Sequence, residues 1–212
     1  MARRVRQTEP LDTLSGVVTE YAQIEELLSA GEFRGRAWVL DRSNRTGSAL
    51  ATPTDHDILD LHRAMFGDFI PWAGTTRVDE RGPGGNVPIP AHDVRAALRT
   101  FTQDLAAWVA ALATIDTAAI SVVIADAHHR FQWIHPFPDT NGRTGRVLDH
   151  YLLWVTFGLH GGALTTSPSI EYFPSASHED AYYDGLAEAD NGRPEALRAF
   201  YLERLLATFE LA

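Results

Sequence analysis

The chain has 212 residues, of which 45% are hydrophobic and 22% are charged, a balance typical of an ordinary folded protein with one domain. Its formal net charge of -10 argues against broad affinity for nucleic acid, because binding to phosphate backbones rests on accumulated positive charge. Cysteine and lysine are both absent, which excludes disulfides, thiolate sites and lysine chemistry, so any bound phosphate must be held by arginine and backbone N–H groups.

The N-terminal residues 1–7 include basic side chains but lack the apolar stretch that a secretory signal needs, and no apolar run in the chain is long enough to span a membrane. We therefore expect a cytoplasmic protein. Further on, Ile24, Leu27 and Leu28 indicate a short helix that ends at Gly31. We expect residues 1–53 to form a helical extension and residues 54–212 to form the main domain.

The signals become sharper from Thr54, which is a good N-cap for a helix whose apolar face includes Ile58 and Leu61. Gly67 is expected to end that helix. In the next segment, residues 74–90, glycine and proline are concentrated between two short pieces that favour strands. This segment is predicted to form a hairpin or flap.

The rest of the chain shows helical periodicity, with apolar residues three and four positions apart. Such patterns run through residues 94–112, 120–134, 141–159 and 194–209. The sequence therefore predicts an all-α protein with one small β-hairpin flap before the helix that begins at Asn141.

Residues 135–146, with the sequence HPFPDTNGRTGR, connect two of these helices. A glycine-containing loop that enters a helix presents unpaired N–H groups, and the helix dipole adds to their attraction for phosphate. Arg143 and Arg146 are three positions apart, so both can project from the first turn toward one place. The stretch is therefore predicted to bind a polyphosphate.

Two further side chains in this stretch are suited to catalysis on such a ligand. Asp139 offers a hard oxygen ligand at the edge of the predicted phosphate site, of the kind that binds Mg²⁺ together with phosphates. His135 titrates near neutral pH and can act as a general base on an incoming hydroxyl.

The same stretch resembles the motif of the Fic family, HxFx[DE]GNGRxxR. The preceding residues 128–134, HHRFQWI, are similar to the segment before the motif in a bacterial subgroup labelled mobile mystery protein B. Only Thr140 departs from the motif, standing where the family usually has glycine. The residues that match are His135, Phe137, Asp139, Asn141, Gly142, Arg143 and Arg146.

The resemblance implies a helical Fic domain that transfers AMP from ATP to a serine, threonine or tyrosine hydroxyl of a target protein. His135 would deprotonate this hydroxyl, Asp139 would position Mg²⁺, and Phe137 would anchor the loop. Phosphate contacts would come from Thr140, Asn141, Gly142, Arg143 and Arg146. The flap would bind the target backbone as an added strand through Thr75, Thr76, Arg77, Val78 and Val87.

Thr140 leaves two alternatives open, because a β-branched residue is disfavoured at positive φ. One is a nucleotide-binding module with weakened catalysis. The other is the Doc branch of the family, which transfers the γ-phosphate and also lacks this glycine. That branch carries lysine at the position of Gly142 and lacks the final arginine, so AMP transfer is favoured here.

Inhibition and metal chemistry raise two further questions. Many Fic proteins carry an inhibitory helix with the pattern [ST]xxxE[GN], which the N-terminal region here does not match. We therefore expect a separate antitoxin-like partner, as in a toxin-antitoxin pair, or no inhibition. A metal hydrolase using His128, His129, His135 and Asp139 is disfavoured, because adjacent histidines point in different directions and the arginines would have no role.

Overall fold

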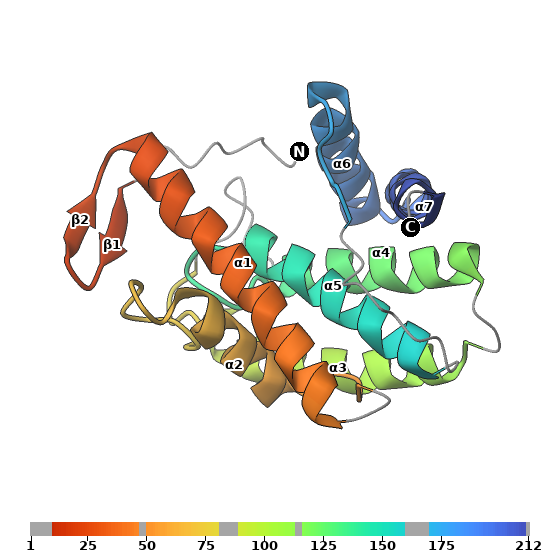
Figure 1. Cartoon of the computed structure of the whole chain (residues 1–212), viewed down its shortest axis with the longest axis horizontal. Coiled ribbons are helices and arrows are strands. Elements are labelled where there is room, and N and C mark those ends of the chain that lie inside the picture. Colours follow the sequence, from red (N-terminus) through yellow and green to blue (C-terminus); the bar gives the residue numbers. More distant parts are fainter. Residues whose placement is uncertain (1–9, 47–49, 81–88, 113–115, 160–169, 211–212) are drawn as a thin grey trace.

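The computed structural model describes residues 10–46, 50–80, 89–112, 116–159 and 170–210. These residues form a helical molecule with one two-stranded sheet, which confirms the predicted class (Figure 1). The elements in chain order are β1 (Leu11–Thr13), β2 (Gly16–Val18), α1 (Tyr21–Thr46), α2 (Asp55–Phe66), the 3-10 turn η2 (Ala91–Asp93), α3 (Val94–Ala110), α4 (Thr117–Ile134), α5 (Asn141–Leu159), α6 (Ala176–Asp190) and α7 (Glu195–Glu210).

The hairpin lies elsewhere than the sequence predicts. Strands β1 and β2 pair antiparallel, with Leu11 opposite Val18, and they precede α1. In the predicted flap, residues 75–80 form no strand, and residues 81–88, including Val87, lie outside the described residues. The described residues 75–80 are thus irregular, and the glycine- and proline-rich part of the predicted flap is not tested.

Helix α1 is much longer than predicted, because Gly31 does not end it. A Cβ atom at Gly31 would lie 2.5 Å from Cε1 of Phe66, and one at Gly35 would lie 2.6 Å from Cγ of Met65. Both glycines therefore permit close packing of α1 against α2, a role that only contacts distant in sequence reveal.

Helix α2 begins and ends as predicted. The Thr54 side chain accepts from the backbone N–H of Asp57, while the Asp57 carboxylate accepts from the backbone N–H of Thr54, forming a capping box. At the other end, the N–H of Gly67 donates to the carbonyl of Arg63. The cap fixes the register in which Ile58, Leu61 and Met65 face the core.

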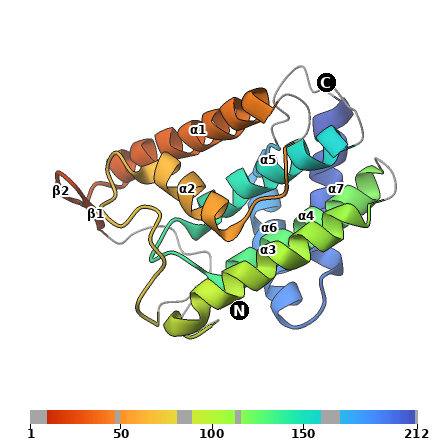
Figure 2. The ribbon, with the colours of Figure 1, turned by 90° about the horizontal axis from the view of Figure 1, so that it is seen from below.

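Helices α4 and α5 lie at the centre of the molecule (Figures 1 and 2). Helix α1 packs on α2 and α5, α3 packs on α4, and α7 packs on α4 and α6. Helix α6 was not predicted, because its buried positions are few; Tyr182, Gly185, Leu186 and Ala189 alone face the interior among its described residues. In the part of the chain that the structure describes, no helix is long and apolar enough to cross a membrane.

A buried polar cluster joins α5 to the C-terminal helices. The carboxylate oxygen Oδ2 of Asp149, on α5, accepts from the hydroxyls of Tyr172 and Tyr201, each at 2.8 Å, and lies 2.7 Å from Nδ1 of His128. Nε2 of His128 lies 2.6 Å from the hydroxyl of Tyr182. Because the Asp149 side chain is only 1% exposed, hydrogen bonds from these donors take the place of those that water would make to the carboxylate.

Candidate active site

His135 ends helix α4 in a left-handed conformation, with φ 49° and ψ 60°. Its N–H donates to the carbonyl of Phe131 at 3.0 Å, and Pro136 follows and prevents continuation of the helix. A non-glycine residue at positive φ is uncommon and persists where its surroundings hold it. The turn that ends α4 therefore also fixes the direction of the proposed catalytic imidazole.

Arg77 supplies much of that support, and its place differs from the one predicted for a target-docking residue. Its side chain is buried, and its guanidinium donates to the carbonyls of His135 at 2.7 Å, Asp79 at 2.8 Å and Ile89. Its backbone N–H donates to the carbonyl of Pro136 at 2.8 Å. Arg77 thus joins the base of the flap to the end of α4 and satisfies a carbonyl that the helix leaves unpaired.

The side chains of the other described flap residues are more exposed than that of Arg77. Val78 is 90% exposed, Thr75 is exposed and Thr76 is half-buried. These side chains remain accessible to a target segment, whereas that of Arg77 is not.

The surroundings of His135 keep its ring neutral. The pKa of His135 is lowered to about 4, chiefly by burial and to a smaller degree by the positive charge of Arg77, while the backbone of Gln132 acts in the opposite sense. A neutral imidazole at physiological pH can accept a proton at once.

The loop after His135 is stapled by Asn141. Its side-chain oxygen accepts from the N–H of Phe137 at 2.9 Å, and its side-chain nitrogen donates to the carbonyl of Phe137 at 2.8 Å. Because both ends of this buried amide are engaged, the side chain holds the loop and leaves the predicted phosphate contacts to backbone groups. Phe137 itself is fully buried, as an anchor requires, and stacks on the ring of His62.

Thr140 adopts the conformation that the motif glycine would favour, with φ 66°. Its N–H donates to Oδ1 of Asp139 at 2.5 Å, and its carbonyl accepts from the N–H of Thr144 at 2.9 Å. The backbone at Thr140 thus takes the positive φ that glycine adopts readily.

Gly142, which belongs to the motif, and Gly145, which stands at one of its variable positions, meet different surroundings. A Cβ atom at Gly145 would lie 2.5 Å from Nε2 of Gln132 and 3.0 Å from Cε1 of His128. A Cβ atom at Gly142 would meet only Nη1 of Arg146, at an ordinary 3.7 Å. Packing of α5 on α4 thus requires glycine at position 145, whereas packing among the described residues does not require it at position 142.

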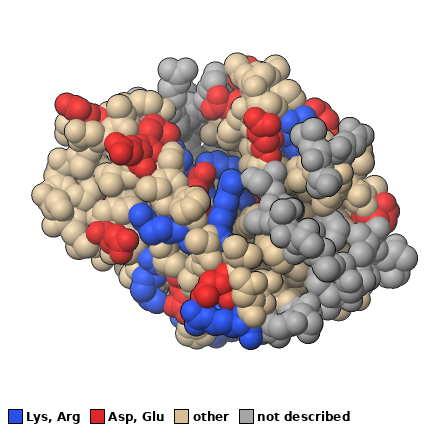
Figure 3. All heavy atoms as spheres, viewed as in Figure 1, with Lys and Arg blue, Asp and Glu red and all other residues tan. Residues whose placement is uncertain are grey.

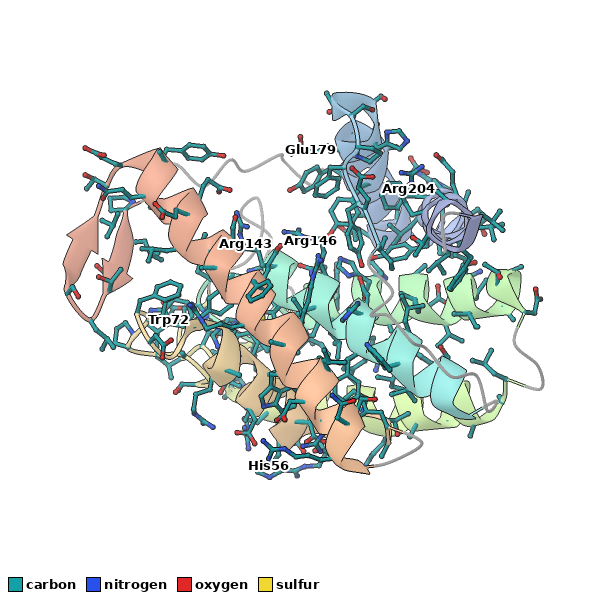
Figure 4. The ribbon with its side chains drawn as sticks, in the orientation of Figure 1. His56, Trp72, Arg143, Arg146, Glu179 and Arg204 are labelled. Carbon is teal, nitrogen blue, oxygen red and sulfur yellow. The ribbon has the colours of Figure 1, made fainter. Side chains whose placement is uncertain are left out.

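The two motif arginines lie side by side at the start of α5, close to α1 (Figure 4). Nη2 of Arg143 donates to both carboxylate oxygens of Glu25 at 2.8 Å, and Nη2 of Arg146 donates to Glu32 at 2.7 Å. Glu32 also lies 3.8 Å from Nη1 of Arg143. Figure 3 shows arginine atoms gathered in the middle of this face with acidic atoms beside them. Carboxylates of α1 therefore meet the charges that the sequence assigns to phosphate binding.

Arg146 is held from two directions. Its guanidinium carbon lies 6.0 Å from the ring centroid of Tyr172 and 5.5 Å from that of Phe173. Burial by itself lowers the pKa of Arg146, but the charge and hydrogen bond of Glu32, together with Tyr182 and Tyr172, outweigh burial, so the net pKa is raised. The guanidinium is thus a fixed positive charge at the start of the helix.

Sequence reasoning missed three residues of this site. Glu25 and Glu32 lie seven positions apart on α1, which places them on one side of a helix, but the expected end at Gly31 hid that pattern. His62 contacts Thr140 across 78 positions, so no local signal announces it. No group of three or more His, Cys, Asp or Glu side chains among the described residues is arranged to hold a metal ion, which gives the metal-hydrolase alternative no support.

Comparison with known proteins agrees with this geometry. Residues 52–153 match the family model described as Fic/DOC family. The chain is 35% identical over 102 residues to a protein adenylyltransferase Fic of Drosophila willistoni and 34% identical over 102 residues to that of Drosophila melanogaster. Each match covers 47% of this chain, which spans only 19% and 20% of these relatives.

Solved structures resemble the chain over most of its length. The BepC protein of Bartonella tribocorum, with bound AMPPNP, superposes with a TM-score of 0.65 at 14% identity and 93% coverage of both chains. The N-terminal Fic domain of a Bartonella quintana protein superposes with a TM-score of 0.67 at 16% identity, covering 97% of this chain and 96% of that one. The residues that match the Fic/DOC family model include the motif loop between α4 and α5, so this part of the chain is similar to that family in sequence and in the position of its motif.

Proposed function

We propose that the protein transfers AMP from ATP to a serine, threonine or tyrosine hydroxyl of a target protein. The observation that carries this proposal is the motif loop itself, which runs from the mostly enclosed His135 at the end of α4 to two arginines in the first two turns of α5. The relatives named protein adenylyltransferase support the reaction type, and the Bartonella structure with bound AMPPNP supports a nucleotide as co-substrate.

Each motif residue has one role in the proposed AMP transfer. The target hydroxyl oxygen attacks the α-phosphorus of ATP, its proton passes to His135, and the bond between the α-phosphorus and the bridging oxygen breaks to release pyrophosphate. Arg143 and Arg146 stabilise the charge of this leaving group, and the N–H groups at the start of α5 hold the phosphates. His135 is assigned as the base by its position in the motif, and its lowered pKa of about 4 means that its ring is unprotonated near neutral pH.

Mg²⁺ is expected to accompany the nucleotide. Asp139 provides a hard carboxylate ligand at the loop, and Mg²⁺ in nucleotide sites typically takes one or two carboxylates together with phosphate oxygens and water. The donor set therefore fits a metal that arrives with ATP better than a resident metal ion. When bound, the ion would neutralise phosphate charge, and Asp139 would orient it.

Helix α1 is proposed to hold the site in a resting state. Glu25 and Glu32 already neutralise the arginines that a triphosphate needs, so binding requires these ion pairs to open. In this proposal the N-terminal extension, residues 1–53, regulates the domain formed by residues 54–212. A separate antitoxin-like protein, acting on the same arginines or on the flap, is the alternative source of inhibition. Use of ATP supports a cytoplasmic location.

The proposal is tested with purified wild type, His135→Ala and Glu32→Gln, each incubated with Mg²⁺ and one nucleoside triphosphate in host lysate. We expect peptide mass spectrometry to find a gain of one AMP on a hydroxyl side chain, absent with His135→Ala and increased with Glu32→Gln. A gain of one phosphate would instead assign the Doc-like reaction.

No modification by either wild type or Glu32→Gln, with nucleotide binding retained, would contradict the proposed transfer and support a binding module. Inhibition in trans has its own test. If Glu32→Gln leaves the transfer rate unchanged while a copurifying small protein suppresses it, the resting state belongs to that partner and not to α1.

A further inference from the structure

Thr140 occupies a strained position in the loop. It is 4% exposed and has φ 66°, a conformation that glycine adopts readily and a β-branched residue does not. Such residues persist only where the surrounding contacts over-determine them. The loop must therefore contain contacts that a glycine at this position would not need.

The side chain of Thr140 makes two such contacts. Its hydroxyl oxygen lies 2.9 Å from Nε2 of His62 and 2.5 Å from the carbonyl oxygen of Asp139. Glycine could make neither. Both contacts act on the side-chain oxygen and so restrict rotation about the strained backbone of Thr140.

The hydrogen positions in this group follow from one donor. The backbone N–H of Gly74 points to Nδ1 of His62 at 2.7 Å, and because an amide N–H can only donate, Nδ1 must be unprotonated. The hydrogen of the neutral ring is then on Nε2 and is donated to the hydroxyl oxygen of Thr140. The hydroxyl hydrogen in turn is donated to the carbonyl of Asp139.

His62 is itself held firmly. Its ring is fully buried and stacks on Phe137, with ring centroids 3.6 Å apart and an angle of 13° between the planes. Burial, with a smaller contribution from Arg63, lowers the pKa of His62 to about 3, which preserves the neutral ring near neutral pH. Gly74, its other partner, has φ 76°, and a Cβ atom there would lie 2.9 Å from the carbonyl oxygen of Leu59.

We propose that His62 is a positioning residue for the reaction, which holds Thr140 in the left-handed conformation and links the catalytic loop to the base of the flap at Gly74. The pair His62 and Thr140 replaces the conformational freedom of the motif glycine with a hydrogen bond. This inference rests on the nucleotidyl transfer proposed above. It assigns to α2 a direct role in shaping the loop on which His135 and Asp139 stand.

A double-mutant cycle separates this role from ordinary core packing. The variants are His62→Phe, Thr140→Gly and the two combined, since phenylalanine retains the stacked ring but loses both hydrogen bonds. We expect His62→Phe to lower kcat by about tenfold or more in the wild-type background, with little change in the KM for ATP, and to have a much smaller effect in the Thr140→Gly background. The combined variant should recover to within about threefold of Thr140→Gly, because glycine needs no hydrogen bond to hold positive φ.

An equal loss of activity from His62→Phe in both backgrounds would overturn the proposal, because His62 would then act independently of Thr140. Thr140→Ser and Thr140→Val provide the matched control, since they leave His62 unchanged. We expect serine, which retains the hydroxyl, to remain active, and valine, which retains only the β-branch, to lose activity as His62→Phe does. Equal activity of the two would also overturn the proposal.

A measurement without turnover keeps the two proposals distinguishable. The N–H of Thr144 donates to the carbonyl of Thr140, so its hydrogen exchange reports on the loop directly. We expect exchange about tenfold faster in His62→Phe and near the Thr140→Gly rate in the combined variant. This pattern in a protein without transferase activity would refute the proposed function and leave the positioning role standing, whereas unchanged exchange in His62→Phe would refute the positioning role.

Discussion

Two carboxylates form contacts at the motif helix α5: Glu32 reaches it from α1, whereas Asp149 belongs to α5 itself and contacts residues of α4 and of the C-terminal part of the chain. Glu32 on α1 is 19% exposed and pairs with Arg146. Asp149 is 1% exposed and serves two tyrosine hydroxyls and His128. A partly exposed ion pair can exchange its carboxylate for a phosphate at small cost, whereas a buried carboxylate with several donors cannot leave without stranding them. We call the ion pair of Glu32 with Arg146 the replaceable side of the helix. The cluster around Asp149 is its permanent side.

Arg146 lies between these two sides. Its charge is met by Glu32, while its flat face rests near the rings of Tyr172 and Phe173. Tyr172 also donates to Asp149, so the permanent side fixes the platform under the guanidinium. A phosphate that displaced Glu32 would therefore meet an arginine already in place.

The largest expected effect comes from breaking the permanent side. Asp149→Ala leaves three buried donors without their acceptor, and we expect the free energy of unfolding to fall by about 3–5 kcal/mol. Asp126→Ala is the control, because its ion pair with Arg198 is about one-third exposed. Urea unfolding followed by circular dichroism measures both, and similar losses would show that burial does not set the difference.

Acid is expected to act on two histidines at the motif loop, His62 on α2, which contacts Thr140, and His135 at the end of α4. Folding lowers the pKa of His62 to about 3 and that of His135 to about 4, so between these values and about 6.5 the unfolded chain binds more protons. The free energy of unfolding is therefore expected to be highest above about pH 6.5. It should fall as the pH is lowered, by roughly 2 kcal/mol for each of the two histidines at pH 5. Urea unfolding at pH 7.5 and pH 5 measures this, and His62→Phe should remove about half of the difference.

Breaking the replaceable side should change binding more than stability. Glu32→Gln removes the charge that competes with phosphate, and we expect the affinity for ATP to rise about tenfold, which corresponds to about 1.4 kcal/mol. The free energy of unfolding should change by less than about 1 kcal/mol. Glu26→Gln, on the exposed face of the same helix, is the matched control for calorimetric titration. Equal gains in both variants would mean that only the overall charge matters.

The smallest expected effect comes from removing a single donor from the permanent side, the cluster around Asp149. Tyr201→Phe removes one of the donors to Asp149 and should lower the free energy of unfolding by about 1 kcal/mol. Because Tyr201 does not support Arg146 through its ring, the affinity for ATP should remain that of wild type. A clear loss of ATP affinity would show that the whole cluster, and not Tyr172 alone, positions the arginine.

The sequence predicted correctly those features that depend on residues close together in the chain. The capping box at Thr54 and the end at Gly67 gave α2 its bounds, and the fixed spacing of the motif placed His135 and Arg146 on adjacent helices. What failed depends on contacts between distant segments. Gly31 was interpreted as a helix end because its partner Phe66 belongs to another helix, and α6 has too few buried residues to show a period.

The same limit applies to the site. The pairs formed by Glu25 with Arg143 and by His62 with Thr140 join residues 118 and 78 positions apart, and no pattern within either segment identifies its partner. The buried place of Arg77 could not be predicted either, because an arginine in a glycine-rich flap has the composition of an exposed residue.

Gly142 and Gly145 are only three positions apart, but their different surroundings imply two different evolutionary constraints. One is packing within the protein and the other is space for a ligand. Position 145 is limited by His128 and Gln132, so substitutions there should accompany changes in those two side chains. Position 142 meets nothing closer than 3.7 Å in the described protein, and alanine there should even favour the helix. If relatives retain glycine at position 142 while the neighbouring positions vary, the constraint at position 142 would come from space that the bound ligand needs and not from packing within the protein.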